Sequence, residues 1–131
     1  MTVLHVLDST VLIDFLRGRP VVARVMRLRA NGDVPATTAI NVEEIVRGLR
    51  ASEIEAARHL FSGLIVLPVE TRAAWQAGTW RRTFAARGVA LYQSDCLVAA
   101  TAWVNDGALA TGNPKDFPMR DIKVEHWPVG Q

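Results

Sequence analysis

Cysteine and long apolar runs are the scarcest features of this sequence of 131 residues. Its one cysteine, Cys96, cannot form an internal disulfide, which excludes a disulfide-stapled secreted scaffold and favours a reducing, cytoplasmic location. Pro68 interrupts the apolar stretch 64–69, and the stretch 96–104 is short, so no segment reaches the roughly 20 residues of a membrane-spanning helix. The first residues lack the basic head of a signal peptide. We therefore expect no membrane association.

Lysine is also rare, because Lys115 and Lys123 are the only lysines among 15 basic residues. The planar guanidinium of arginine suits phosphate groups, which makes nucleic acid an admissible partner. An arginine-rich surface can equally reflect solubility or coding bias. Because the chain also has 13 acidic residues, its formal net charge is only +2. This net charge does not distinguish a nucleic-acid-binding surface from a merely soluble one.

The spacing of apolar residues predicts strands that alternate with helices. Strands are expected at 3–7, 34–36, 64–69, 108–111 and 122–127, with 64–69 buried. Ser9 is expected to be the N-cap of the first helix, and Ser52 of a later one. Without a tight hairpin signal, this alternation predicts a short, mainly parallel sheet covered by helices on both faces. The fold class is therefore a three-layer α/β/α architecture, as one domain over residues 1–131.

Three acidic residues follow the predicted strands or begin a helix near their ends. Asp8 directly follows the first strand, and Asp116 follows the strand 108–111, with Asn113 three residues before it. Asp95 lies in the first turn of a helix and shares a stripe with apolar residues. Sites in parallel sheets lie at the carboxyl ends of the strands. The other interpretations are a helix N-cap for Asp8, a helix-dipole partner for Asp95 and an ordinary loop acid for Asp116.

Two adjacent glutamates, Glu43 and Glu44, lie on the predicted helix 38–50. The apolar face of this helix is expected to carry Val42, Ile45, Val46 and Leu49. Glu44 points roughly opposite this face, and Glu43 flanks it, so a solvated face is the default for both. Alternatively, the second face of the helix borders a cleft, where Gly48 leaves room for a ligand. The pattern alone does not choose.

Acidic side chains that converge at one sheet edge repel each other unless a cation is bound. Their ligands are oxygen atoms only, because His5, His59 and His126 are scattered and show no metal-ligand spacing. Carboxylate oxygens select Mg²⁺ or Mn²⁺ over zinc. The sequence therefore predicts a magnesium or manganese site.

Four short segments together resemble the motifs of PIN-domain ribonucleases, above all VapC-type toxins of toxin–antitoxin modules. They are Val-Leu-Asp8-Ser-Thr, Glu44-Ile-Val-Arg-Gly48, Asp95-Cys-Leu-Val-Ala-Ala100 and Thr111-Gly-Asn113-Pro-Lys-Asp116-Phe117. The resemblance implies a PIN-like fold and a Mg²⁺-dependent endoribonuclease, with Mn²⁺ as a substitute. It implies that Asp8 and Asp95 are metal ligands, and that Asp116 and Glu44 complete the acidic, catalytic pocket. Thr111 and Asn113 are expected to support them.

The same resemblance implies three partners: an RNA substrate, a cognate antitoxin protein, and a second copy of the chain in a homodimer or a toxin–antitoxin hetero-oligomer. Apolar residues of the first and third predicted helices exceed what a thin domain can bury, so an antitoxin helix or a second protomer could cover them. Two groups of arginines are candidates for contacts with RNA phosphates or antitoxin acids, or else belong to solvated helix faces: Arg81, Arg82 and Arg87 on one helix, and Arg24, Arg27 and Arg29 on another.

Two alternative functions stay open at this point. One is a PIN-like protein that is catalytically silent and acts only by binding its partner. The other is a receiver-type signalling domain, which also places acids and Mg²⁺ at strand ends. That domain requires an acidic pair after the first strand, where this sequence has only Asp8.

Overall fold

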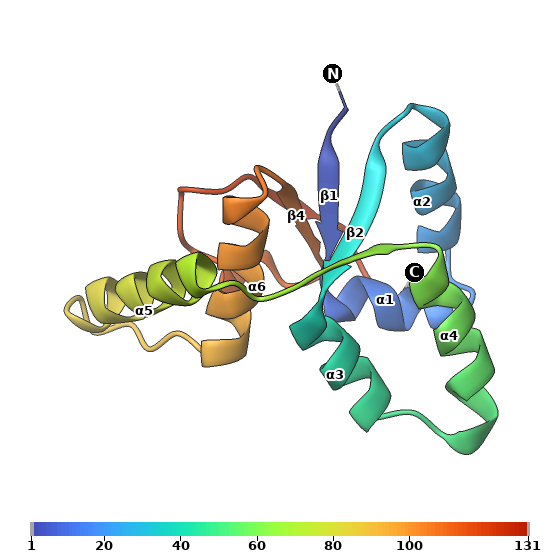
Figure 1. Ribbon diagram of the computed structural model, residues 1–131, viewed down its shortest axis with the longest axis horizontal. Coiled ribbons are helices and arrows are strands. Elements are labelled where there is room, and N and C mark those ends of the chain that lie inside the picture. The colour runs from blue at the N-terminus through green and yellow to red at the C-terminus, as the bar shows by residue number, and fades with distance from the viewer. Residues whose placement is uncertain (1, 131) are drawn as a thin grey trace.

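Short runs of apolar residues form five parallel strands between layers of helices (Figure 1). The structure, a computed structural model, describes residues 2–130. The strand order is β3-β2-β1-β4-β5, and every neighbouring pair is parallel. The strands are β1 (Leu4–Leu7), β2 (Val34–Thr38), β3 (Ile65–Leu67), β4 (Ala108–Thr111) and β5 (Val124–His126). The predicted parallel sheet is confirmed.

Helices cover both faces of this sheet, which confirms the three-layer α/β/α fold class. They are α1 (Ser9–Leu16), α2 (Val21–Ala30), α3 (Ala39–Arg47), α4 (Ile54–Ser62), α5 (Thr71–Ala85) and α6 (Gln93–Val104), with 3₁₀ turns η1 (Ala51–Glu53) and η2 (Pro114–Asp116). Helices α5 and α6 lie on one side of the sheet in Figure 1, and α1, α2 and α4 on the other.

The two halves of the core follow from the alternation of side chains along the strands. Val6 of β1 packs with α5 and α6, and the next residue, Leu7, packs with α1 and α2. Helix α3 follows β2 without a loop and contacts α1, α4 and α6. It therefore lies beside the carboxyl edge of the sheet, where the acidic residues were expected.

Two local expectations were wrong. Strand β3 is an edge strand, so Ile65 and Val66 are exposed, and only its last residue, Leu67, is buried. The buried face of α3 carries Ile45 together with the polar Asn41, whereas Val46 is 54% exposed. This face is rotated from the expected one because α3 packs against α1 and α6 at once.

Two helix starts also differ from the expectation. Ser9 is the first residue of α1, and Asp8 takes the N-cap position. A 3₁₀ turn containing Ser52 precedes α4, whose N-cap residue is Glu53. Among residues 2–130, no helix combines the length and the apolar character that crossing a bilayer requires.

Candidate active site

Asp8 is buried where β1 meets β4. Its carboxylate Oδ2 accepts hydrogen bonds from Oγ1 of Thr111 at 2.8 Å and from Oγ1 of Thr10 at 3.2 Å. Although Asp8 occupies the N-cap position of α1, its side chain makes no capping hydrogen bond. Asp8 is therefore the N-cap residue of α1, as one interpretation held, but its carboxylate does not cap the helix and is oriented by β4 instead.

Asn41 is the buried centre of a hydrogen-bond network that sequence reasoning missed. Its side-chain Oδ1 accepts from Oγ1 of Thr38 at 2.7 Å, and its Nδ2 donates to Oγ of Ser9 at 3.0 Å and, at a longer 3.4 Å, to Oδ1 of Asp8. The Thr38 hydroxyl also caps α3 by accepting from the Asn41 backbone amide. Because Thr38 occupies the amide oxygen, the amide nitrogen must face the acidic residues.

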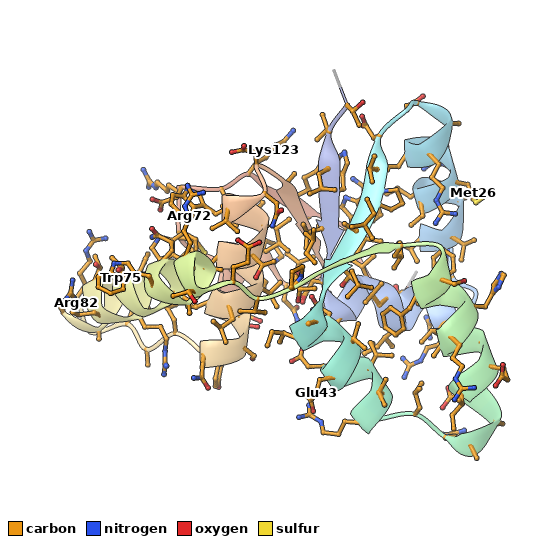
Figure 2. All side chains as sticks on the ribbon, in the orientation of Figure 1. Met26, Glu43, Arg72, Trp75, Arg82 and Lys123 are labelled. Carbon is orange, nitrogen blue, oxygen red and sulfur yellow. The ribbon has the colours of Figure 1, made fainter. Side chains whose placement is uncertain are left out.

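Glu44 joins the same network through Ser9. The hydroxyl of Ser9 donates to Oε1 of Glu44 at 2.8 Å, so this half-buried glutamate faces α1. Glu43 is 62% exposed and pairs with Arg47 at 3.6 Å on the outer face of α3 (Figure 2). A solvated face is therefore correct for Glu43 and wrong for Glu44, and the two positions have different environments.

Asp95 and Asp116 complete the acidic group. Asp95 is half-buried in the first turn of α6, and Asp116 is exposed in η2. Asn113 is exposed and takes the N-cap position of η2, and its backbone amide donates to Oγ1 of Thr111 at 3.0 Å. The Thr111 hydroxyl is thus hydrogen-bonded both to the start of η2 and to Asp8. These two hydrogen bonds hold η2 beside Asp8.

The electrostatics show that the four carboxylates share one local field. Burial raises the pKa of Asp95 to about 6, and the negative charges of Asp116, Asp8 and Glu44 raise it as well. Burial also raises the pKa of Asp8, while the hydrogen bond from Thr111 opposes this shift. Among residues 2–130, none of these acids belongs to an ion pair with arginine, lysine or histidine. Hydrogen bonds to Asp8 offset part of the repulsion, but no ion pair does so among residues 2–130.

This donor set fits a hard divalent cation. In the part of the chain that the structure describes, no three His, Cys, Asp or Glu side chains are arranged closely enough to hold an ion by themselves. Mg²⁺ does not need such a cage, because it keeps several waters and binds through one or two carboxylates. His5 cannot contribute, since its ring nitrogens face Glu125 and Asp33. Oxygen ligands with unpaired negative charge match Mg²⁺ and Mn²⁺.

The sequence holds one signal for Asn41 that the apolar pattern concealed. Asn41 lies four residues before Ile45, on the face of α3 that packs inward, and three residues after a threonine that can cap the helix. A polar side chain on an inward face requires hydrogen-bond partners. Ser9 and Thr10 gave no such signal, because both follow Asp8 in a helix start where hydroxyl residues are common.

Comparison with known families agrees with this site. A profile of the PIN domain family matches residues 5–122. The chain belongs to the PIN domain family. Ribonuclease VapC19 of Mycobacterium tuberculosis H37Rv is 32% identical over 117 residues, which are 88% of this chain and 94% of that protein. Ribonuclease VapC10 of the same strain is 36% identical over 113 residues, 86% of this chain and 84% of that protein. The expected resemblance to VapC proteins is confirmed.

Solved structures show the same PIN fold. DNA-bound VapBC from Salmonella typhimurium has a TM-score of 0.82 at 23% identity and covers 97% of this chain and 99% of that chain. A toxin–antitoxin complex from Klebsiella pneumoniae has a TM-score of 0.71 at 23% identity, covering 92% and 95%. PIN membership excludes the receiver-type alternative for this chain.

Proposed function

We propose that this PIN domain is a divalent-metal-dependent endoribonuclease and the toxin of a toxin–antitoxin pair. The observation that carries the proposal is the meeting of Asp8, Glu44, Asp95 and Asp116 in one electrostatic field without a protein cation. The names of its VapC relatives as ribonucleases support RNA as the substrate.

Asp8 and Asp95 are the residues that would hold Mg²⁺ or Mn²⁺, with Glu44 and Asp116 contributing directly or through water. A cation held there would supply Lewis acidity, by activating water and neutralising charge on the scissile phosphate. The chain itself supplies rigidity: Asp8 accepts hydrogen bonds from the Thr111 and Thr10 hydroxyls on one oxygen and from an amide on the other. A carboxylate restrained in this way keeps its orientation when substrate binds.

The neighbouring glutamates provide a matched test. Glu44→Gln should lower RNA cleavage by roughly 10- to 100-fold, because a residue that orients or supports a metal site has effects of this size. Glu43→Gln, which alters an exposed pair with Arg47, should stay within about twofold of the wild type. Cleavage is measured on total RNA and on a labelled oligonucleotide, with Mg²⁺, Mn²⁺ or EDTA. Failure of the wild type to cleave RNA with either metal would reject the proposal.

A groove beside the site suits the antitoxin. It has a volume of about 380 Å³. Its apolar lining residues are Ile13 and Leu16 of α1, Ile45 of α3 and Leu49 just beyond α3, and its charged lining residues are Arg17, Glu44, Arg50 and Glu53. Ile13 is 38% exposed, so apolar surface there faces water. An amphipathic helix that lays its apolar face into this groove would cover that surface. The toxin–antitoxin complex among the structural neighbours supports such a partner, and the homodimer stays a prediction.

Ile13→Glu should weaken antitoxin binding by about tenfold or more, because a charge would replace an apolar side chain that the antitoxin helix covers. Met26→Glu is the matched control, since Met26 is 56% exposed on α2 and does not line the groove. Affinity is measured by calorimetry with the small protein of the neighbouring reading frame, and RNA cleavage without that protein should be equal in both variants. Equal antitoxin affinity of the two variants would place the partner elsewhere.

A further inference from the structure

Two adjoining cavities lie along α2, where this helix packs against Trp127 at the end of β5. Their volumes are about 200 and 220 Å³, and both are lined by Arg24, Arg27 and Trp127. We call the two together the α2–β5 groove. Its lining includes none of the four acids of the candidate active site and no residue of the groove that suits the antitoxin. The α2–β5 groove is therefore a separate surface.

Trp127 leaves a hydrogen-bond donor of this groove without a partner. Its side chain is 2% exposed, and its Nε1 is the one buried side-chain nitrogen or oxygen among residues 2–130 that has no hydrogen-bond partner. The indole N–H can donate a hydrogen bond but cannot accept one. Because a buried donor without a partner is unfavourable, the indole requires an acceptor that the described part of the chain does not supply.

Two arginines bring positive charge to the same groove. The guanidinium of Arg24 lies over the Trp127 ring, 4.2 Å from the ring centroid. This cation–π contact uses the flat face of the guanidinium, so the N–H donors at its edge remain free for an anion. Arg27 follows three positions later and therefore lies on the same side of α2. In the described range 2–130, neither arginine forms an ion pair.

Asp14 is the one acid that lines the first cavity, and it has other partners. Its Oδ2 accepts a hydrogen bond from the backbone amide of Gly130 at 2.8 Å, and its Oδ1 lies 3.9 Å from Nε of Arg19. The negative charge of Asp14 is thus offset by Arg19. The first cavity keeps the positive charges of Arg24 and Arg27.

The two acids of the second cavity face His5. Nδ1 of His5 lies 2.6 Å from Oε1 of Glu125, and Nε2 lies 3.2 Å from Oδ2 of Asp33. The other carboxylate oxygen of Asp33 accepts a hydrogen bond from the backbone amide of Val3 at 3.1 Å. Because both acids are engaged in this way, the arginines of the groove stay unpaired in the second cavity as well.

The sequence around α2 favours a polyanion as the ligand. Residues 15–32 contain five arginines and no aspartate, glutamate or lysine. Such a run of positive charge attracts the phosphates of a nucleic acid, and the fork of a guanidinium binds phosphate through two N–H groups. A base cannot stack on Trp127, because Arg24 covers the ring and the rest of the side chain is buried. The groove therefore suits a phosphate group rather than a base.

We propose that the α2–β5 groove binds a phosphate group, which accepts hydrogen bonds from Arg24, from Arg27 and from the indole N–H of Trp127. The unpaired groups there are all donors, so the matching ligand is an anion with several acceptor oxygens. Two sources carry this group: the backbone of an RNA, and free inorganic phosphate. The RNA source rests on the proposed ribonuclease function, whereas the phosphate site itself does not. An RNA bound there would be held by a contact outside the acidic site.

Inorganic phosphate is the first probe. The chain has four tryptophans, and two-dimensional ¹H–¹⁵N NMR follows their indole signals during a titration with phosphate in EDTA. EDTA prevents phosphate from binding through a metal ion at the acidic site, and sodium chloride of equal ionic strength is the control. The indole signal of Trp127, assigned with Trp127→Phe, should shift. The signal of Trp75, which is 79% exposed on α5, should not.

Substitution of the arginines tests the donors. Arg27→Gln should weaken phosphate binding by roughly tenfold, because it removes a charged donor. Arg27 is exposed, so the fold should persist, and the Tm of the variant checks this. Arg24→Gln should have an effect of similar size. Arg82→Gln is the matched control, since Figure 2 shows Arg82 on α5 at the end of the molecule opposite Met26 of α2. Its phosphate affinity should stay within about twofold of the wild type.

Fluorescence anisotropy with a labelled RNA, in EDTA and over a range of salt concentrations, identifies the source of the phosphate. If RNA supplies it, Arg27→Gln should weaken RNA binding and lower its salt dependence by roughly one phosphate contact, and inorganic phosphate should compete with RNA. If Arg27→Gln loses phosphate affinity but binds RNA as well as Arg82→Gln does, the groove binds free phosphate.

Three results would overturn the site. They are an indole signal of Trp127 that does not respond to phosphate, equal phosphate affinity of Arg27→Gln and Arg82→Gln, and a loss in Arg27→Gln of affinity only for the small protein of the neighbouring reading frame. The last result would make the groove a peptide contact. The ribonuclease proposal fails separately: if the wild type cleaves no RNA with Mg²⁺ or Mn²⁺, the phosphate titration still decides whether the groove binds phosphate.

Discussion

Asp95→Asn is expected to lower RNA cleavage by roughly 1000-fold or more and to remove the rise in melting temperature that Mg²⁺ causes. A metal ligand contributes several kcal/mol of charge stabilisation, which corresponds to this loss of rate. Mg²⁺ held by the proposed site would bind only the folded state and would relieve repulsion among the acids, so it should raise the Tm of the wild type. The asparagine retains the shape of the side chain but no longer carries its charge.

The same substitution should flatten the pH dependence of stability in EDTA. The pKa of Asp95 is raised from its ordinary value of 3.8 to about 6, so the folded state binds this proton more tightly than the unfolded state. Ionisation of Asp95 therefore destabilises the folded state, and this effect reaches its full size above about pH 6. The free energy of unfolding should increase as the pH falls from 7.5 toward 5. Asp95 is only half-buried, so solvent screening reduces the effect to roughly 1–2 kcal/mol, or a few degrees of Tm.

Asp106→Asn is the matched control for both measurements. Asp106 is exposed beyond the other end of α6, and its positive φ of 53° is one that asparagine also adopts. Cleavage, the Mg²⁺-dependent Tm and the metal-free pH profile should all match the wild type in this variant. If Asp95→Asn kept its Mg²⁺-dependent shift in scanning fluorimetry, Asp95 would not belong to a metal site.

Asn41→Asp is expected to destabilise the protein by roughly 3–5 kcal/mol at pH 7.5, or about 10 °C or more in Tm. Asn41 is fully buried, and its Nδ2 lies 3.4 Å from Oδ1 of Asp8 and 3.0 Å from Oγ of Ser9. The substitution replaces this donor with a carboxylate oxygen, which places a second negative charge against Asp8. It also removes the hydrogen bond to the Ser9 hydroxyl, so the orientation of Glu44 is no longer supported.

The double variant Asp8→Asn with Asn41→Asp tests this explanation. It exchanges the acid and the amide across the same contact, so the like-charge repulsion disappears and most of the lost Tm should return. Cleavage should not return, because the carboxylate has moved from β1 to α3. Thermal and urea unfolding in EDTA measure the stability. If the double variant were no more stable than Asn41→Asp alone, the contact between residues 8 and 41 would not cause the loss.

The places of Asp8, Asp95 and Asp116 in the fold could be predicted from the sequence, because each stands at a recognisable end of an element. A buried strand that ends in an acid, or a helix whose first turn carries one, is visible in local spacing. The same kind of spacing gave the wrong buried face for α3, on which Val46 was expected. The buried face instead carries the polar Asn41, which is hydrogen-bonded to Thr38 and Ser9.

The choice between Glu43 and Glu44 shows where local pattern stops. Both residues are acidic and lie next to each other on one helix. Their chemistry and local spacing therefore do not show which of them faces the site. Ser9 distinguishes them through a 2.8 Å hydrogen bond to Glu44 across 35 residues of sequence. The motif Glu44-Ile-Val-Arg-Gly48 implies Glu44 only through the family resemblance, whereas the hydrogen bond gives a physical reason for the inward orientation of Glu44.

The sequence by itself determined three features. They are the scarcity of cysteine and apolar runs, the order of strands and helices, and the place of the acids at the carboxyl edge of a parallel sheet. These features depend on composition, on local periodicity and on the rule that parallel strands end together. Only the tertiary structure decided that Asn41 joins Asp8 and, through Ser9, Glu44, that Glu43 faces solvent, and that Arg24 lies over the ring of Trp127. Those contacts depend on how α1, α2, α3 and the end of β5 pack, and packing brings together side chains whose neighbourhood no local pattern contains.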